Sequence, residues 1–434
     1  MLNLSSVSYV FNYYSNRHKH IVNSTFTLSC ERSTVISSRQ IIGFPLILLG
    51  LVCVDARADE LDTLQFRASE NVQYDSNVFR LSDSVNAQAL IGTPTRSDTT
   101  AVTSVGVKLN KPYGLQRFEL DVSATDHRYK RFSGLNFTAF DYAAAWRWSL
   151  TPAFHGNFTS DRREYVDTTA DVQSVGALNR RTERSTLLDA EYELGAAWRL
   201  LGGVSERNST SSLPFTFEGN SKVRSAEAGV GYVFASGTSL AYRLKNGNGE
   251  YSNLPTAIPF SSDFSQREHE FRFELPSTGR TTVRGRMSHL SRDHDVLAAR
   301  DFSGFTGQLD ATYAITGKTS LIGGVARDLG SYQTTTSSYY ESMRLFVGPT
   351  WKATEKIALR LRYDRDARKY KGPLPGFVDS GRRDTADLVT LAVDWEPIRA
   401  VKVTASAQRD QRRSNLSGFD YKSNVFGLAA QVNF

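Results

Sequence analysis

Residues 188–198 read LDAEYELGAAW, and their side chains alternate in character from one position to the next. One face carries Leu188, Ala190, Tyr192, Leu194, Ala196 and Trp198, and the other carries Asp189, Glu191 and Glu193. A period of two residues is typical of a β-strand, whose side chains point alternately to opposite faces of the sheet. This stretch therefore predicts a strand that separates an apolar environment from an aqueous one.

The same alternation recurs along the chain after residue 59. It is clear over residues 140–150 (FDYAAAWRWSL), 305–315 (FTGQLDATYAI) and 357–363 (IALRLRY). No stretch of this region shows the apolar stripe with a period of 3.6 residues that marks a helix. No fixed-period repeat is visible either, which argues against a soluble β-propeller or β-solenoid.

The connections between these strands alternate in length. Eight short turns are predicted near residues 111–114, 151–152, 200–202, 235–237, 276–279, 316–318, 353–355 and 397–399. Nine longer polar stretches lie near 75–98, 127–136, 161–182, 207–221, 246–263, 290–302, 331–339, 365–383 and 410–420. Seventeen connections imply about 18 strands. Short turns on one side and long loops on the other are typical of bacterial outer-membrane barrels.

We therefore predict an all-β protein: a transmembrane, antiparallel up-and-down β-barrel with short periplasmic turns and longer extracellular loops. Closing the sheet leaves no backbone amide unpaired in lipid, which is the condition for crossing a bilayer with strands. All five Trp lie within a few residues of a predicted short turn, as expected for an aromatic belt at one membrane interface. The expected location is the bacterial outer membrane, with its lipids as partners.

The last strand supports this prediction. The chain ends YKSNVFGLAAQVNF, and Phe426, Leu428, Ala430 and Val432 share a face with the terminal Phe434. A terminal aromatic residue on an amphipathic last strand resembles the sorting signal that the barrel-assembly machinery of the outer membrane reads. We therefore expect Phe434 to act as an assembly signal and this machinery to be a partner.

The N-terminal segment is predicted to be a targeting sequence. Residues 39–58 combine a basic flank, the 14-residue apolar run Ile41–Val54 and a small-x-small site at Ala56–Ala58. This pattern indicates a signal peptide cleaved after Ala58, with the barrel occupying residues 59–434. Residues 1–38 are polar and patternless, so we expect them to be an extension that arises from a start site placed too early, with an extended signal as the alternative. The apolar run is shorter than the roughly 20 residues of a membrane-spanning helix.

Composition excludes several other classes of function. The 434 residues carry a net charge of +7, but the basic residues are dispersed among acidic ones, which argues against nucleic-acid binding. Two Cys are too few for a disulfide scaffold or a thiolate metal site. The cluster His289, Asp293, His294 and Asp295 falls in a predicted outer loop, so we interpret it as solvated. We expect no enzymatic activity, no cofactor and no metal.

Charged residues are expected on the water-facing side of the strands. Toward the C-terminal half the basic ones stand out, namely Arg284, Arg286, Arg344, Arg360, Arg362 and Lys402. Guanidinium and ammonium groups along a lumen could form a track for a hydrated anionic polymer. The alternative is that these charges are salt-bridged across a water-filled lumen, and the sequence leaves both open.

The first predicted strand carries a short motif. It consists of Tyr74, Asp75, Asn77, Val78, Phe79 and Arg80 within the stretch DTLQFRASENVQYDSNVFRLSD at residues 62–83. An aromatic residue followed by Asp-x-Asn-Val-Phe-Arg resembles the EpsL-like family of outer-membrane barrels, which accompany exosortase B in exopolysaccharide gene clusters. This resemblance implies a role in the biosynthesis or export of extracellular polysaccharide, with export partners in the periplasm. No catalytic residues carry over.

Three hypotheses about function follow. The first is an outer-membrane conduit or accessory barrel for export of extracellular polysaccharide through an aqueous lumen. The second is a general or solute-specific diffusion porin. The third is a barrel enzyme, or a structural barrel that conducts nothing.

Overall fold

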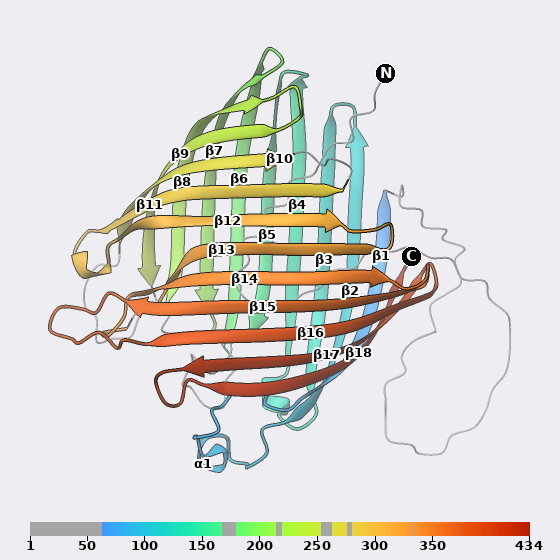
Figure 1. The fold of residues 1–434 in the computed structure, drawn as a ribbon, viewed down its shortest axis with the longest axis vertical. Coiled ribbons are helices and arrows are strands. Elements are labelled where there is room, and N and C mark those ends of the chain that lie inside the picture. Colours follow the sequence, from blue (N-terminus) through green and yellow to red (C-terminus); the bar gives the residue numbers. More distant parts are fainter. Residues whose placement is uncertain (1–62, 167–178, 214–218, 253–262, 276–279, 333) are drawn as a thin grey trace.

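The computed structural model describes residues 63–166, 179–213, 219–252, 263–275, 280–332 and 334–434. These residues form a single 18-stranded antiparallel sheet (Figure 1). Its strands are β1 (Leu64–Asp75), β2 (Asp98–Tyr113), β3 (Gln116–Tyr129), β4 (Phe137–Thr151), β5 (Phe154–Val166), β6 (Arg180–Leu194), β7 (Trp198–Ser211), β8 (Asn220–Val233), β9 (Ser239–Ser252), β10 (Phe264–Leu275), β11 (Thr281–His294), β12 (Phe302–Ala314), β13 (Thr319–Ser331), β14 (Tyr339–Lys352), β15 (Ile357–Lys371), β16 (Arg383–Ile398), β17 (Val401–Ser414) and β18 (Tyr421–Asn433).

The sheet closes on itself. Each strand pairs with its neighbours in the sequence, and β1 also pairs with β18 from Arg67 opposite Asn433 to Asp75 opposite Val425. Closure leaves no free sheet edge, so every strand is hydrogen-bonded to a neighbour on both sides. The predicted up-and-down barrel and its strand number are confirmed.

Most predicted connections are found where the sequence placed them. One prediction is wrong: residues 200–202 are not a turn but lie inside β7. The turn is at residues 195–197, where Gly195 adopts a φ of 65° that suits glycine. The pair Gly202 and Gly203 suggests a turn in the sequence, yet both residues keep extended pairing with β6. The predicted turn at 276–279 lies outside the described residues, as do the central parts of the predicted loops at 161–182, 207–221 and 246–263, the predicted signal peptide and the N-terminal extension.

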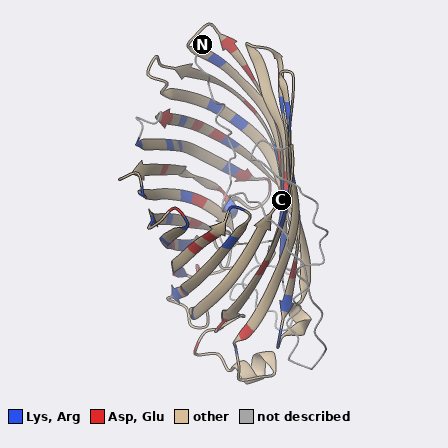
Figure 2. Cartoon of the chain, turned by 90° about the vertical axis from the view of Figure 1, so that its right-hand side faces the viewer, with Lys and Arg blue, Asp and Glu red and all other residues tan. Residues whose placement is uncertain are grey.

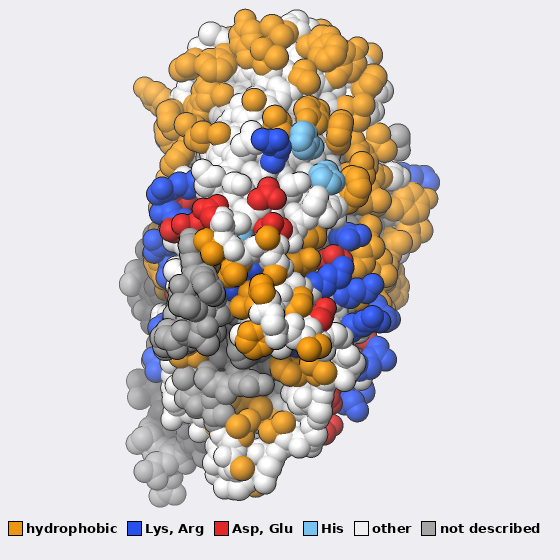
Figure 3. All heavy atoms as spheres, turned by 90° about the vertical axis from the view of Figure 1, so that its left-hand side faces the viewer, with side chains coloured by type: hydrophobic (Ala, Val, Ile, Leu, Met, Phe, Trp, Pro, Cys, Tyr) orange, Lys and Arg blue, Asp and Glu red, His pale blue; other side chains and the backbone are white. Residues whose placement is uncertain are grey.

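The outward face of the barrel is apolar. Outward-pointing residues such as Leu200, Phe271, Met287 and Leu428 are exposed although they are large and hydrophobic. The Trp belt is confirmed, because Trp146, Trp198, Trp351 and Trp395 are exposed next to short turns, and Trp148 packs against Phe154 at the same turn as Trp146. Hydrophobic side chains cover much of the surface in Figure 3.

The inward face is polar, and acidic and basic residues recur along the strands over the height of the barrel (Figure 2). The inward residues of β10, for example, are Glu268, Glu270, Arg272 and Glu274, and they alternate with outward Phe271, Phe273 and Leu275. No helix among the described residues is both long and apolar enough to cross a membrane.

The first outer loop folds into a small cap. It contains the one-turn-and-a-half helix α1 (Ala87–Ile91), which begins after the N-cap Asn86 and ends at Gly92 in the left-handed conformation. Phe79 and Leu81 of this loop pack with Leu135 of the 3₁₀ helix η1 (Ser133–Leu135) in the next outer loop. A second 3₁₀ helix, η2 (Ala298–Arg300), lies in the outer loop between β11 and β12.

Candidate functional site: the charged lumen wall and the closing seam

The lumen wall contains a network of opposite charges centred on Glu270 of β10. The Glu270 side chain is fully buried, and Lys245 of β9 donates a hydrogen bond to it over 2.8 Å. Arg272 also donates to this carboxylate, and Nη1 of Arg286 lies 3.9 Å from it. Three cations thus surround one carboxylate, and Glu268 adds a second acid near Lys245 and Arg286.

The network continues around the wall through Asp328 of β13. Nη2 of Arg286 lies 3.5 Å from Asp328, and Arg344 of β14 donates a hydrogen bond to the same carboxylate. One aspartate therefore joins two strands that are not neighbours, β11 and β14. Such a bridge requires side chains that lie along the inner surface of the barrel and do not point to the centre of the lumen.

A second network is centred on Asp394 of β16. Arg360 donates a hydrogen bond to this carboxylate over 2.8 Å, and Thr404 donates another over 2.8 Å. Nζ of Lys402 lies 3.3 Å from Asp394 and 3.3 Å from Glu396. Asp394 and Lys402 are buried, so both charges depend on each other for stabilisation.

The remaining two predicted track residues are also paired. Arg284 lies 2.8 Å from Glu274, and Arg362 lies 2.7 Å from Asp364. The Arg362 guanidinium also lies 4.4 Å from the ring centroid of Phe346, which faces the lumen beside it. All six cations named from the sequence face inward, and each one contacts a carboxylate.

This pairing favours the interpretation of salt-bridged lumen walls over a run of free cations. A paired cation attracts a passing anion less, because the field of its carboxylate opposes its own. The anionic track remains a prediction about the polymer, but these six residues do not form an uncompensated basic strip. The wall presents donors and acceptors side by side, a surface that can exchange hydrogen bonds with a hydrated solute.

Glu270 and Asp394, the acids at the centres of the two networks, were not predicted from the sequence. Glu270 is on the same face of β10 as Arg272 and Glu274, because side chains at every second position of a strand point to the same side. The alternation already assigns that face to the lumen. In the same way, Asp394 is on the same face of β16 as the lumen-facing Ala392 and Thr390. The alternation could therefore have identified both acids as lumen-facing. The ion pair between Arg286 and Asp328, in contrast, requires side chains long enough to reach across β12.

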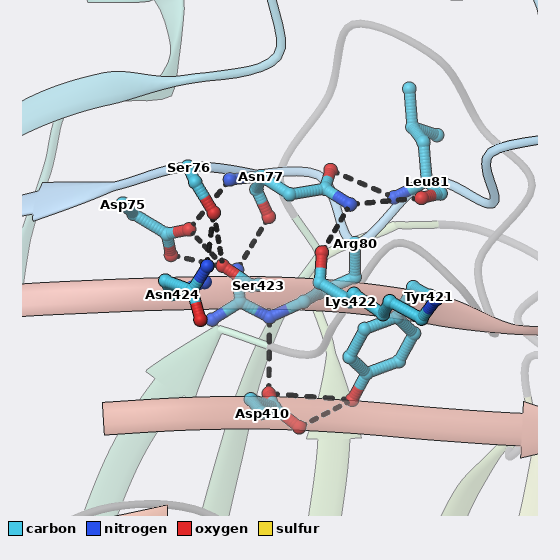
Figure 4. Close-up of polar contacts among 10 residues, drawn as sticks. All are labelled: Asp75, Ser76, Asn77, Arg80, Leu81, Asp410, Tyr421, Lys422, Ser423 and Asn424. Carbon is cyan, nitrogen blue, oxygen red and sulfur yellow. Dashed lines mark hydrogen bonds and ion pairs between the residues drawn. The ribbon is translucent and has the colours of Figure 1, made fainter.

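The first-strand motif forms a buried latch where the barrel closes (Figure 4). Arg80, in the outer loop after β1, lies with Nη1 2.7 Å from Asp75 and Nε 3.2 Å from Asp410 of β17. Tyr421 of β18 donates a hydrogen bond to Asp410 over 3.2 Å. Arg80 thus connects the first strand to the last two strands, although Asp410 lies 330 residues away in the sequence.

Arg80 remains protonated in this position. Burial alone lowers the pKa of Arg80, but the adjacent carboxylates of Asp75 and Asp410 outweigh burial and raise the pKa above its ordinary value. The residue also adopts a φ of 52°, in the left-handed region that non-glycine residues rarely occupy. The ion pairs hold a conformation that the backbone alone disfavours.

Asn77 fixes the backbone of the same latch. Its Nδ2 donates hydrogen bonds to the carbonyl oxygens of Leu81, over 2.8 Å, and Lys422, over 3.0 Å. Its Oδ1 accepts a bond from the Leu81 amide over 3.0 Å. One amide side chain therefore ties the first outer loop to itself and to β18.

The other motif residues divide between two roles. Asp75 accepts a hydrogen bond from Ser423 of β18 over 2.5 Å, whereas Tyr74 points outward and is exposed. Phe79 is buried in the cap formed with η1, and Val78 packs against the same cluster. The motif is therefore a structural unit of the seam and the first loop.

Phe434 contributes to the other end of the seam. Its amide donates to the Phe66 carbonyl over 2.9 Å, its carbonyl accepts from the Phe66 amide over 2.5 Å, and the two rings stack 6.0 Å apart. The terminal residue is thus integrated in the closing strand pair. Its role as an assembly signal remains a prediction.

The histidine-rich cluster does not come together. β11 extends to His294, so three of its four residues lie in a strand, not in a loop. His289 points outward against Phe305, whereas buried Ser288 points inward and His294 lies near Asp301. Opposite faces separate these groups, which leaves no catalytic arrangement among them.

One group of possible metal ligands escaped the sequence analysis. The ligand atoms of His155, Glu191 and Glu193 lie within 4.8 Å of one another on the lumen side of β5 and β6. Arg199 of β7 already lies 3.2 Å from Glu191 and 3.4 Å from Glu193. A cation at this position would compete with that guanidinium, so we interpret the group as a further ion-pair network.

An apolar outward face, a polar inward face and a Trp belt on a closed antiparallel sheet define the environment of the chain. The protein is an outer-membrane β-barrel. No protein-family model and no curated protein matches its sequence significantly.

Solved structures of similar shape are barrels of the outer membrane. A BenF-like porin from Pseudomonas fluorescens Pf-5 matches with 12% identity and a TM-score of 0.48, covering 86% of this chain and 100% of the porin. OpdK from Pseudomonas aeruginosa matches with 12% identity and a TM-score of 0.44, covering 86% and 99%. A mutant of the ferric enterobactin receptor PfeA from the same organism matches with 9% identity and a TM-score of 0.42, covering 85% and 80%. Resemblance at this level carries no argument about substrate.

Proposed function

We propose that the barrel serves export of extracellular polysaccharide by providing a hydrated path across the outer membrane. The observation that carries the proposal is the lumen wall, in which cations and carboxylates alternate around β9–β17 in charge-compensated networks. The resemblance of the first-strand motif to the EpsL-like family supplies the substrate class.

A compensated wall suits a polymer that is rich in hydroxyl groups. Carboxylates accept hydrogen bonds from sugar hydroxyls, and guanidinium groups donate to sugar oxygens, so both kinds of contact are available at every level. Because the charges neutralise each other, the wall does not hold an anionic or cationic segment by net attraction. Such a surface replaces the hydration of a sliding chain without binding it tightly.

A diffusion porin is the second candidate, and the same wall favours it. Small polar solutes also require a water-compatible lining, and nothing in the compensated networks selects a polymer over a monomer. The two candidates differ in what the isolated barrel does, since a porin conducts ions steadily without partners.

The proposal is tested in the bacterium that produces the protein. The gene is deleted, and sugar analysis measures polysaccharide in the medium and in the periplasm. Export predicts loss of polysaccharide from the medium that is restored by the wild-type gene. Normal secretion in the deletion strain would reject export and favour the porin.

Two complementing variants sharpen this experiment. Glu270→Gln disturbs the central lumen network, whereas Glu341→Gln makes the same chemical change on the outward face of β14. Export through the lumen predicts reduced secretion with Glu270→Gln at equal barrel abundance in the membrane, and normal secretion with Glu341→Gln. Equal secretion with both variants would argue against passage along this wall.

A further inference from the structure

Four basic side chains on the outward face of β15–β18 form what we term the outer cationic patch: Lys369, Arg383, Arg409 and Lys422. The strand alternation and register place them on the same face as outward apolar residues such as Val389 and Phe426. All four residues are exposed. They lie toward the ends of the strands that join the long outer loops, directly beyond the apolar belt.

The strand register places these like charges beside one another. Lys369 and Arg383 are direct cross-strand partners. Arg409 pairs with Asn424 and Gln411 pairs with Lys422, so Arg409 and Lys422 are diagonal neighbours. Like charges in such positions destabilise a sheet, since their side chains are within reach of one another.

The patch has an acidic cross-strand neighbour, Glu341 opposite Lys369, but this carboxylate forms its ion pairs with other cations. The outward faces of β13–β18, which are described in full, contain two acids, Glu341 and Asp387. Lys371 lies 2.8 Å and Arg327 lies 3.4 Å from Glu341. Both acids are thus engaged elsewhere, because Asp387 lies 2.5 Å from Arg413 and 3.8 Å from Arg365. None of the four patch residues has an ion-pair partner among the described residues.

The opposite side of the barrel is arranged differently. On the outward face of β7 and β8, Lys222 and Arg224 both lie near Glu206, at 3.5 Å and 2.7 Å. Arg128 lies 2.6 Å from Asp126 on β3, and Arg162 lies 2.9 Å from Glu164 on β5.

Figure 3, viewed from the side of the outer loops of β12–β16, shows Lys and Arg side chains gathered along its right-hand edge.

We propose that the outer cationic patch binds the phosphate groups of a phosphorylated lipid in the outer leaflet. One phosphate bridges Lys369 and Arg383, and a second bridges Arg409 and Lys422, which turns two repulsive pairs into charge-assisted contacts. The acyl chains of the same lipid lie on the apolar outward residues next to the patch, among them Tyr363, Val389 and Phe426.

The position of the patch decides between a lipid and a soluble anion. The cations are at the edge of the apolar belt, so a ligand with both phosphate groups and acyl chains contacts both surfaces at once. Basic residues attract anionic lipid when they lie at the membrane surface, and this attraction decays within a Debye length. A free phosphate or an anionic polysaccharide gains nothing from the adjacent hydrocarbon-facing strands.

The full-length barrel is purified, reconstituted in phosphatidylcholine nanodiscs doped with bisphosphorylated lipid A, and assayed by native mass spectrometry for retained lipid A. The test variant is K369Q/R383Q/R409Q/K422Q. The matched control, R128Q/R162Q/K222Q/R224Q, removes the same number of outward cations where acids accompany them. Heat-modifiable electrophoretic mobility verifies that each barrel is folded.

We expect the wild type and the matched control to retain bisphosphorylated lipid A, and the patch variant to retain at least about tenfold less. Dephosphorylated lipid A is expected to bind weakly to all three proteins. A charge-conserving variant, K369R/R383K/R409K/K422R, is expected to bind like the wild type, which separates loss of charge from disturbance of the fold.

Three outcomes would overturn the proposal. The first is equal retention by the wild type and the patch variant, and the second is an equal loss in the matched control. The third is displacement of lipid A by a soluble uronic-acid polysaccharide that binds at the patch, which would assign this surface to a polysaccharide.

Discussion

The cations of the lumen wall and those of the outer cationic patch have opposite surroundings. Arg286 and Arg344 share Asp328, and Lys402 lies between Asp394 and Glu396. Lys369 and Arg383, on the outside, are cross-strand neighbours of like charge, and Glu341 on the other side of Lys369 pairs with Lys371 and Arg327 instead. The six cations named from the sequence are therefore compensated in the lumen, whereas those of the outer cationic patch have no ion pair among the described residues.

This difference indicates two uses of the same residue types. Inside, an unpaired charge on a crowded wall would be costly, and each of the six cations named from the sequence lies beside an acid. Outside, the unpaired cations remain hydrated and available for an external anion. A basic residue in a barrel sequence can therefore be assigned to a ligand site only after the acidic residues that surround it in the structure are known.

The largest expected effect comes from breaking a buried lumen network. Glu270→Gln leaves Lys245, Arg272 and Arg286 with one fewer carboxylate, and we expect a loss of about 3 kcal/mol in the free energy of unfolding. Urea unfolding in lipid vesicles, followed by Trp fluorescence, measures this loss. The outward control Glu341→Gln should cost less than about 1 kcal/mol. Similar losses in both variants would show that the two faces do not differ.

The latch at the seam extends the comparison to an outer loop. Arg80→Ala removes a buried cation from Asp75 and Asp410, and we expect a loss of about 2 kcal/mol in unfolding free energy. The first outer loop should also become a substrate for limited proteolysis. Asp83→Ala is the matched control, because its carboxylate is 78% exposed and pairs only at the surface with Arg96. An uncleaved loop in the Arg80 variant would contradict the assigned role.

Ion selectivity tests whether the lumen is compensated. Arg362→Ser removes one cation beside Asp364, and we expect the reversal potential in planar bilayers to shift toward cation selectivity. The swap R362D/D364R keeps the pair on the same strand face and should leave selectivity near that of the wild type. A free anion track predicts a change in both variants, so a shift with the swap would restore that hypothesis.

The smallest effect concerns the patch alone. Lys422→Glu places an acid opposite Gln411 and diagonally beside Arg409, and in phosphatidylcholine we expect it to stabilise the barrel by about 0.5 kcal/mol. Added salt should reduce this gain, because the pair is exposed. The corresponding change inside, Arg344→Glu, should destabilise by placing a second carboxylate beside Asp328. Destabilisation by Lys422→Glu would mean that Lys422 already has a stabilising partner.

Local patterns predicted most of the fold. Alternation over stretches such as residues 188–198 identified strands, and the alternating connection lengths identified the strand number. The error at residues 200–202 has a local cause, since a Gly-Gly pair is equally compatible with a turn and with an extended strand. Only the pairing of β6 with β7 shows that the turn is at Gly195.

The site was less accessible from the sequence. Arg80 and Asp75 are close in the chain, but Asp410 joins them because β17 and β18 close against β1. Parity places Arg286 and Asp328 on the lumen side, yet their contact crosses an intervening strand and depends on register and side-chain direction.

The sequence by itself determined which side of each strand meets lipid and which meets water, because a period of two residues encodes that choice directly. It also determined the number of strands through the spacing of turns and loops. Only the tertiary structure decided which charges are compensated. An ion pair requires two groups within a few ångströms, and in a closed sheet that proximity is set by the register and curvature of strands that are far apart in the chain.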